Sequence, residues 1–133
     1  MNTDKKNCFS CTPELDELTE KVIGAVHEVA NTLGVGFLEK VYQRALVQEL
    51  RARGLKADAE VPMDVFYKYE CVGNYFVDVV VEEQLLVELK CVSELRPEHF
   101  AQCMNYLKAC AQPLCLLVNF QSTRVQCKRV VNQ

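Results

Sequence analysis

Hydrophobic residues recur every three or four positions in the first part of the chain, as on one face of a helix. One run follows Thr12 and Pro13, and a second begins near Gly36 and ends at Gly54. Thr12 and Pro13 are typical of a helix N-cap and first turn, and glycine is typical of a helix C-terminus. The pattern predicts an angled pair of helices, the first ending near Gly34, with apolar faces formed by Leu15, Leu18, Val22, Ile23, Val26 and Val29 and by Leu38, Val41, Tyr42, Ala45, Leu46 and Leu50.

After Leu55 the pattern changes to alternating polar and apolar residues, many of them β-branched. Pro62 predicts that the first strand of this region lies at a sheet edge or carries a bulge. Short polar turns separate the strands, so an antiparallel meander is expected. We predict strands over residues 57–69, 75–81 and 85–92, with turns at Gly73-Asn74 and at residues 82–84.

The last part of the chain contains one more helix and two more strands. Pro97 begins a helix to about Ala111, the continuous apolar run 113–120 is a buried strand, and 124–131 is a final strand. This order predicts an α/β fold in which helices cover a central sheet. A chain of 133 residues is long enough for one core, so we expect a disordered tail over residues 1–11 and a single domain over 12–133.

Three charged residues interrupt the apolar strands of the meander. If residues 82–84 form a three-residue loop, Val81 pairs with Leu85 and Asp78 lies opposite Glu88. Lys90 follows Glu88 by two positions and therefore projects from the same face. A loop one residue shorter would break this register.

Two facing carboxylates repel each other unless a proton or a cation lies between them. Oxygen ligands of this kind suit Mg²⁺ or Mn²⁺, and a nearby lysine can orient a water or stabilise charge on a phosphoryl group. The alternative is an amphipathic hairpin whose charged face lies in water. Phe76, Val80 and Leu86 share that face, which indicates that it is at least half covered.

Composition limits the partners and the cellular location. The net charge is −3, which excludes strong general attraction to nucleic acid and leaves only local contact. We see neither a signal peptide nor an apolar run that could span a bilayer, so we expect a cytoplasmic protein without membrane contact. Six of the eight cysteines lie within or beside apolar segments and are predicted to be reduced core thiols: Cys71, Cys91, Cys103, Cys110, Cys115 and Cys127.

Three motifs resemble known nucleases. Asp78, followed after nine residues by Glu88-Leu89-Lys90, resembles the D…ExK signature of the PD-(D/E)XK nuclease superfamily. The segment GFLEKVY at residues 36–42 resembles the motif of the GxxExxY family, and QCMNY at 102–106 resembles the QxxxY motif of RecB-like nucleases. The resemblance covers about residues 15–131. It implies a restriction-endonuclease-like αβββαβ core, with a mixed central sheet flanked by helices and an extra N-terminal helix.

The resemblance also implies roles for individual residues in Mg²⁺- or Mn²⁺-dependent cleavage of phosphodiester bonds in DNA or RNA. Asp78 and Glu88 would be metal ligands, with Glu39 as a further ligand or a water-binding acid, and Lys90 would be the catalytic lysine. Gln102 and Tyr106 are four residues apart and so share a helix face, where they either hold Lys90 or a phosphate oxygen or merely support the sheet. Glu39 is otherwise a surface acid. Tyr42 is expected to pack in the core.

Some positions depart from the pattern of the relatives. The chain has Ala30 where they have a histidine and Phe76 where they have an arginine. The alternative function is therefore a catalytically inactive nuclease-fold module that binds a protein partner or forms a homo-oligomer. His27 and His99 are weaker site candidates, because a lone helix histidine is more often structural.

Some RecB-like nucleases carry an iron–sulfur cluster on cysteines that flank the core. In this chain Cys8 and Cys11 form a single CxxC motif, and no second pair matches it. The sequence therefore argues against an iron–sulfur cluster or zinc.

Overall fold

The computed structural model describes residues 11–121 and 123–133. Its elements follow the predicted order, and the fold class is confirmed. The expected tail lies outside the described residues except for Cys11. The elements are α2 (Pro13–Leu33), α3 (Glu39–Ala52), β1 (Ala57–Tyr67), β2 (Glu70–Val81), β3 (Leu85–Lys90), α4 (Pro97–Cys110), β4 (Leu114–Asn119) and β5 (Gln126–Val131).

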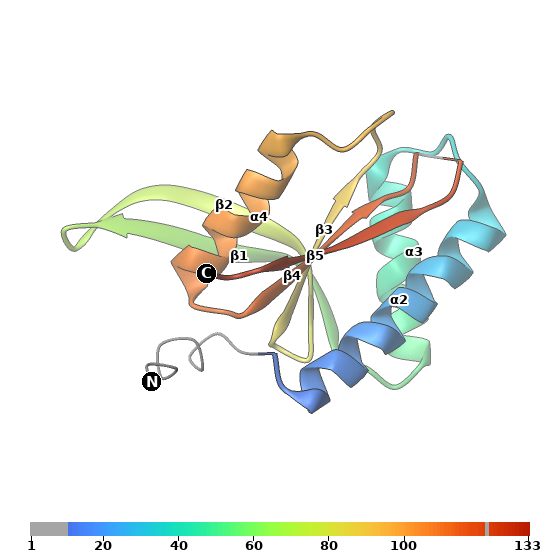
Figure 1. Ribbon diagram of the computed structural model, residues 1–133, viewed down its shortest axis with the longest axis horizontal. Helices are drawn as coiled ribbons and strands as arrows, with labels where there is room; N and C mark the ends of the chain where they lie inside the picture. The colour runs from blue at the N-terminus through green and yellow to red at the C-terminus, as the bar shows by residue number, and fades with distance from the viewer. Residues whose placement is uncertain (1–10, 122) are drawn as a thin grey trace.

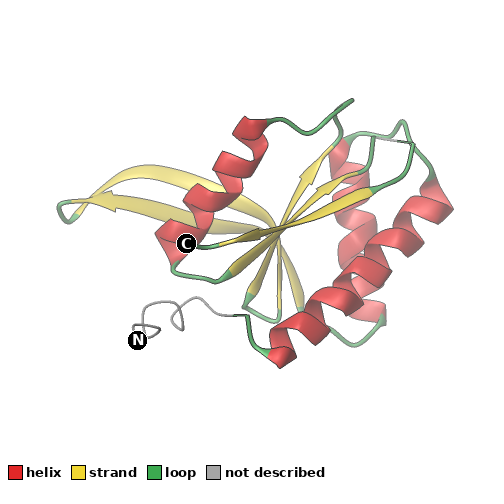
Figure 2. Cartoon of the chain, viewed as in Figure 1, coloured by secondary structure: helices red, strands yellow, loops and turns green. Residues whose placement is uncertain are grey.

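The strands form one mixed sheet in the order β1-β2-β3-β4-β5. β3 and β4 are parallel, and the other neighbours are antiparallel. A parallel pair needs a crossover connection, which α4 supplies. α2 and α3 cover one face of the sheet and α4 lies on the other (Figures 1 and 2). β1 is an edge strand, as Pro62 predicted.

Each face of the sheet carries its own hydrophobic core. The core under α2 and α3 contains the buried residues Val22, Val26, Leu46 and Leu50 from the helices and Val79, Val87, Leu89 and Leu116 from the strands. The core under α4 contains Met63, Val77, Leu86, Cys103, Tyr106, Leu107, Cys115, Leu117 and Val130. The alternation in β3 therefore holds: Val87 and Leu89 face one core, and Leu86 faces the other.

The helix start at Thr12 is confirmed, whereas the second helix differs from its prediction. Thr12 Oγ1 accepts a hydrogen bond from the backbone N–H of Leu15 at 3.1 Å, which is an N-cap contact. α3 begins at Glu39 rather than near Gly36, and it ends at Ala52 with Arg53 as its C-cap. Leu38 is 79% exposed, because it precedes the helix and helical spacing does not govern where its side chain points.

The β1–β2 hairpin is longer than predicted. The Gly73-Asn74 turn is wrong: both residues lie within β2, where they pair with Val65 and Asp64. The turn lies at Lys68 and Tyr69, whose φ angles are 48° and 72°. The register shifts between Val65 and Phe66, so the glycine lies beside a β-bulge, a common place for glycine inside a strand.

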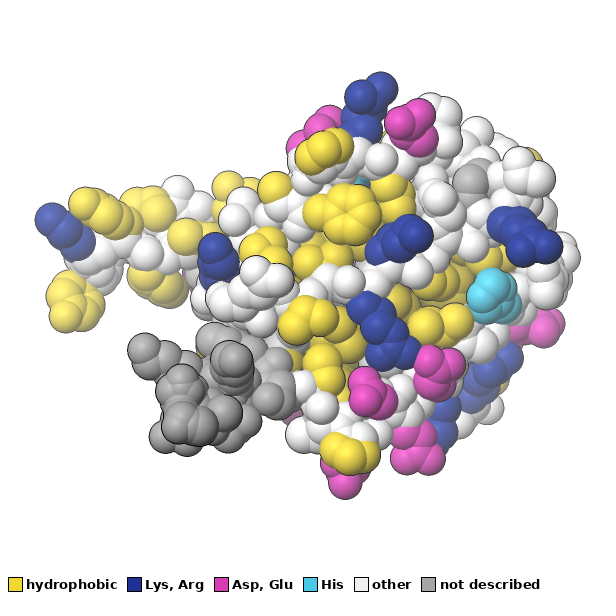
Figure 3. Space-filling view, in the orientation of Figure 1, with side chains coloured by type: hydrophobic (Ala, Val, Ile, Leu, Met, Phe, Trp, Pro, Cys, Tyr) yellow, Lys and Arg dark blue, Asp and Glu magenta, His cyan; other side chains and the backbone are white. Residues whose placement is uncertain are grey.

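The longer hairpin projects from the rest of the fold and carries hydrophobic side chains on its surface (Figure 3). Cys71 lies on this hairpin and is exposed, so its prediction as a core thiol is wrong. Cys103 and Cys115 are buried, and Cys91, Cys110 and Cys127 are partly buried, as expected of core thiols. Among the described helices, none combines the length and the apolar character that a bilayer span requires.

The predicted β2–β3 turn is confirmed. Val81 pairs with Leu85, and Val79 pairs with Val87. Glu82 and Glu83 have φ angles of 53° and 59°, so two left-handed residues close the three-residue loop. This register places the charged residues of β2 and β3 next to each other.

Candidate active site

β2 and β3 stop pairing at the position where their acids lie. Val79 and Val87 are the last paired residues on this side of the turn. Beyond them, Asp78 Oδ2 accepts a hydrogen bond from the backbone N–H of Leu89 at 2.8 Å. The Asp78 side chain thus takes the place of a backbone partner and lies against β3, beside Glu88.

Glu88 is buried, with only 4% of its surface exposed. Its Oε1 atom has no hydrogen-bond partner within the described residues. Burial and the charge of Asp78 raise the pKa of Glu88 to about 8, and Lys90 opposes that rise. A buried carboxylate oxygen without a partner is costly, so the site suits a proton or a bound cation.

Lys90 provides the positive charge nearest to Glu88 among the ion pairs of the described residues. Its Nζ atom lies 3.7 Å from Glu88 Oε2, and 18% of its side chain is exposed. This distance is longer than a direct hydrogen bond, so the ammonium lies beside the carboxylate. The lysine is therefore partly buried within the site.

Glu39 approaches from the first turn of α3. It is exposed, and together with Asp78 and Leu89 it lines a small cavity of about 50 Å³. Desolvation and the charge of Asp78 raise the pKa of Glu39, while Lys90 lowers it. Desolvation also raises the pKa of Asp78. The charges of Asp78 and Lys90 therefore act on both Glu39 and Glu88.

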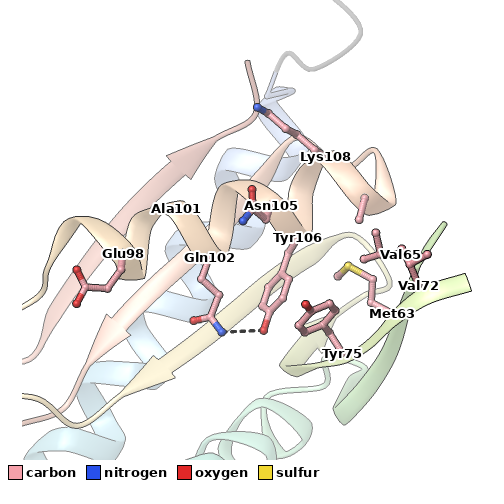
Figure 4. Close-up of a pocket in the computed structure, with 12 residues that line it drawn as sticks. Met63, Val65, Val72, Tyr75, Glu98, Ala101, Gln102, Asn105, Tyr106 and Lys108 are labelled. Atoms are coloured by element: carbon pink, nitrogen blue, oxygen red, sulfur yellow. Dashed lines mark hydrogen bonds between the residues drawn. The ribbon is translucent and has the colours of Figure 1, made fainter. Parts of the chain in front are cut away.

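Gln102 and Tyr106 face each other across one turn of α4. Gln102 Nε2 donates a hydrogen bond to the Tyr106 hydroxyl at 3.0 Å (Figure 4). Burial and the charge of Glu88 raise the pKa of Tyr106 to about 12, so its hydroxyl stays protonated beside the acids. Tyr106 packs on the α4 side of the sheet in the same core as Leu86, whose side chain shares the Glu88 face of β3.

Sequence reasoning missed a second group of residues, which supports the site from α3 and β1. This group consists of Lys40, Gln43 and Glu60. The buried Gln43 donates from Nε2 to the backbone carbonyl of Asp78 at 2.8 Å and to Glu60 Oε2 at 2.7 Å. Lys40 Nζ lies 3.1 Å from the same Glu60 oxygen. Gln43 lies four residues after Glu39 and so shares its helix face, a spacing that could have identified it.

Tyr42 of the GxxExxY-like segment is buried and stacks on Phe120, with ring centroids 4.4 Å apart. Its hydroxyl donates to the carbonyl of Gly34 at 2.5 Å and accepts from the N–H of Phe37 at 3.3 Å. Core packing is therefore confirmed for Tyr42. The tyrosine also holds the loop, in which Gly36 has a φ of 111°, that leads into Glu39.

The two histidines lie apart from the acids. His27 is exposed on α2 and lines a different cavity with Ala30. His99 Nδ1 accepts a hydrogen bond from the backbone N–H of Arg96 at 2.9 Å, which caps α4. Of the CxxC motif, Cys8 lies outside the described residues, and Cys11 has a free thiol.

Comparison with known proteins identifies the superfamily of this chain. The family model of the PD-(D/E)XK nuclease superfamily matches residues 16–130. The chain belongs to this superfamily. The match is at the superfamily level, so membership of the GxxExxY group stays a prediction.

Solved structures agree with the fold. The chain is similar to the alkaline exonuclease LHK-Exo from Laribacter hongkongensis, with a TM-score of 0.54 and 11% identity, over 95% of this chain and 73% of that one. It is also similar to SSO0001, with a TM-score of 0.54 and 16% identity over 70% of this chain, and it covers only about half (49%) of that protein. At these identities the likeness shows the fold alone. No curated protein matches the chain by sequence.

Enzymes of this superfamily generally use divalent metals such as Mg²⁺. The residues present fit such an ion, because Glu88 offers a buried oxygen without a partner beside the Asp78 carboxylate. Within residues 11–121 and 123–133, three or more His, Cys, Asp or Glu side chains nowhere converge as a metal-binding group. Mg²⁺ commonly uses one or two carboxylates, with waters and substrate phosphates completing its ligands.

Proposed function

We propose that this protein is a metal-dependent nuclease that hydrolyses phosphodiester bonds in DNA or RNA, and that it belongs to the GxxExxY group. The observation that carries the proposal is the burial of the Glu88 carboxylate without a partner for one of its oxygens. A buried carboxylate oxygen lies without a partner beside a second acid and a lysine, in a member of a nuclease superfamily. Asp78 and Glu88 are the proposed ligands of Mg²⁺ or Mn²⁺, with Glu39 at the rim.

In the proposed reaction the oxygen of a water molecule loses a proton to solvent and forms a bond to phosphorus. The bond from phosphorus to the ester oxygen breaks, and that leaving oxygen takes up a proton from solvent. Asp78 and Glu88 would hold the divalent metal, which would supply stabilisation of negative charge. The ammonium of Lys90 lies beside Glu88, where it can orient the water and stabilise the growing negative charge. The hydrogen bond from Leu89 holds Asp78 in place during the reaction.

The remaining residues of the proposed site contribute hydrogen-bond donors and one further acid at its rim. Gln102 and Tyr106 are neutral groups that can donate hydrogen bonds to a phosphate oxygen without adding charge. Glu39, partly desolvated at the start of α3, can serve as a further metal ligand or bind a water. Because the net charge is −3, contact with nucleic acid is expected to be local to this site.

Cleavage of labelled DNA and RNA, single-stranded and duplex, tests the proposal in Mg²⁺, Mn²⁺ or chelator. We expect metal-dependent cleavage that falls at least about a hundredfold in Lys90→Met and in Asp78→Asn. The exposed Lys128 on β5 offers a matched control, Lys128→Met, which should cleave normally. Circular dichroism checks that each variant folds. An inert wild-type protein, or full activity in both site variants, would refute the proposal.

The second candidate function is a catalytically inactive binding or oligomerisation module. The observation that favours it is a set of exposed apolar side chains beside Glu39: Val35, Phe37, Leu38 and Val41. Such a patch is typical of a protein interface. Analytical ultracentrifugation of the wild type and of Leu38→Asp tests this candidate, which requires self-association or partner binding that the variant loses.

A further inference from the structure

A groove of about 600 Å³ runs between α4 and the β1–β2 hairpin (Figure 4). Met63 and Val65 contribute apolar side chains from β1, and Tyr75 contributes its ring from β2. Gln102 and Asn105 line the groove from α4, and each carries an amide group. One wall is therefore apolar and aromatic, and the other offers hydrogen-bond donors and acceptors.

A change of direction in the backbone of the β1–β2 hairpin places the hairpin wall of this groove opposite α4. Glu60 has a φ of 54°, although it lies inside β1 between the paired residues Ala59 and Val61. Val77 packs in the core under α4, whereas Val79, two residues later, packs in the opposite core. The hairpin therefore changes direction at Asp78, and its outer half lies over α4.

The groove lies beside the proposed active site, because Tyr106 lines the groove and packs in the same core as Leu86, which shares the Glu88 face of β3. The rings of Tyr75 and Tyr106 lie 6.3 Å apart and are tilted by 55°. Tyr106 is close enough to Glu88 for the charge of that acid to raise its pKa. A group bound beside Tyr75 would thus be a near neighbour of a group bound at the acids.

Tyr75 is half exposed, so its ring is accessible to a ligand. Gly73 lies beside this ring: a Cβ atom at Gly73 would be 3.0 Å from Tyr75 Cε2. Because glycine has no side chain, the Tyr75 ring can lie directly against the backbone at Gly73. Tyr75 is therefore held as a flat surface on the groove wall.

We propose that this groove binds one unpaired nucleobase of the nucleic acid, stacked on Tyr75, next to the phosphate held at the acids. The inference rests on the proposed nuclease function. An aromatic ring can stack on any base, and amide groups can contact the polar edge of a base. The lining has one cation, Lys108, and one acid, Glu98, so it suits a neutral base better than a run of phosphates.

This proposal defines the substrate class as single strands or frayed ends. A base in an intact duplex is paired and stacked, and it must leave the helix before it can enter such a groove. The groove therefore favours nucleic acid that is already unpaired. Binding of DNA strands and of RNA strands, measured side by side, distinguishes the two substrates.

Binding of fluorescent single-stranded DNA and RNA oligonucleotides, followed by anisotropy, tests the groove. The Lys90→Met background is used so that the strand stays intact. We expect Tyr75→Ala to weaken binding about tenfold or more, because one base–aromatic stack is lost. Tyr75→Phe should bind normally, and Gly73→Ala should weaken binding, because the added methyl displaces the ring.

Tyr67→Ala is the matched control, since Tyr67 lies on the same hairpin, is 63% exposed and does not line the groove. This variant should bind like its parent. An oligonucleotide with one abasic position, scanned along the strand, gives a second measurement. One position should weaken binding to the parent about tenfold and leave binding to Tyr75→Ala unchanged.

The outcomes separate this inference from the proposed function. Equal affinity of Tyr75→Ala and its parent, with metal-dependent cleavage by the wild type, overturns the groove and leaves the nuclease. A wild type that neither binds nor cleaves any strand overturns both. If Tyr75→Ala instead abolishes self-association and leaves strand binding intact, a second copy occupies the groove and the inference is wrong.

Discussion

Glu88→Gln should change how the stability of the metal-free protein depends on pH. The pKa of Glu88 is about 8 in the folded state, against an ordinary value of 4.5. Between these values the folded state holds a proton that the unfolded state has lost. Stability is therefore full below about pH 4.5, falls as pH rises, and levels off above about pH 8.

The magnitude follows from the size of this shift. One pKa unit corresponds to about 1.4 kcal/mol, so the shift to about 8 represents a loss of up to about 5 kcal/mol of unfolding free energy. The raised pKa of Asp78 acts in the same direction. Glutamine has the shape of the protonated acid and never ionises. The variant should therefore resemble the wild type near pH 4.5 and exceed its stability by several kcal/mol near pH 9.

Urea unfolding in chelator, at a series of pH values, measures this effect. Far-UV circular dichroism is the suitable signal, because the chain contains no tryptophan. Glu94→Gln replaces an exposed carboxylate and is the matched control, which should keep the slope of the wild type. If the unfolding free energies of the wild type and Glu88→Gln change with pH in the same way, the claim that burial and the charge of Asp78 raise the pKa of Glu88 is refuted.

Three further substitutions test the groups that hold the site. Tyr42→Phe leaves the Gly34 carbonyl and the Phe37 N–H without their partner, so it should cost about 1–3 kcal/mol in urea unfolding. Gln43→Leu removes the hydrogen bond to Asp78, and it should lower cleavage at saturating metal while circular dichroism shows a folded protein. Leu46→Ala empties a fully buried position and should cost about 2–5 kcal/mol, again by urea unfolding.

The sequence predicts well what depends on local pattern. The three-residue loop after Val81 sets the register, and alternation then places Glu88 and Leu86 on one face of β3. Helix starts at Thr12 and Pro97 follow from capping chemistry, which is also local. The count of residues in the hairpin predicts the ladder as far as Val79 and Val87, but the predicted pairing of Asp78 with Glu88 is replaced by a hydrogen bond from the Leu89 N–H to the Asp78 side chain.

Other features depend on contacts that no local pattern encodes. Gly73-Asn74 has the composition of a turn, yet bulged strand pairing places it inside β2. The left-handed backbone at Glu60 is stabilised where Gln43 and Lys40 from another element meet its carboxylate. The hairpin bend, and with it the groove beside Tyr75, begins next to that tertiary contact.

Titration with Mn²⁺ by calorimetry, near pH 7 in buffers of different ionisation enthalpy, tests the central claim most directly. The claim is that Asp78 and Glu88 share one divalent cation in place of a proton. We predict one binding site, with release of about one proton on binding, since the pKa of Glu88 lies near 8 in the metal-free protein. Glu88→Gln should lose both the binding and the proton release. Absence of binding at millimolar Mn²⁺, or unchanged binding in the variant, would contradict the account.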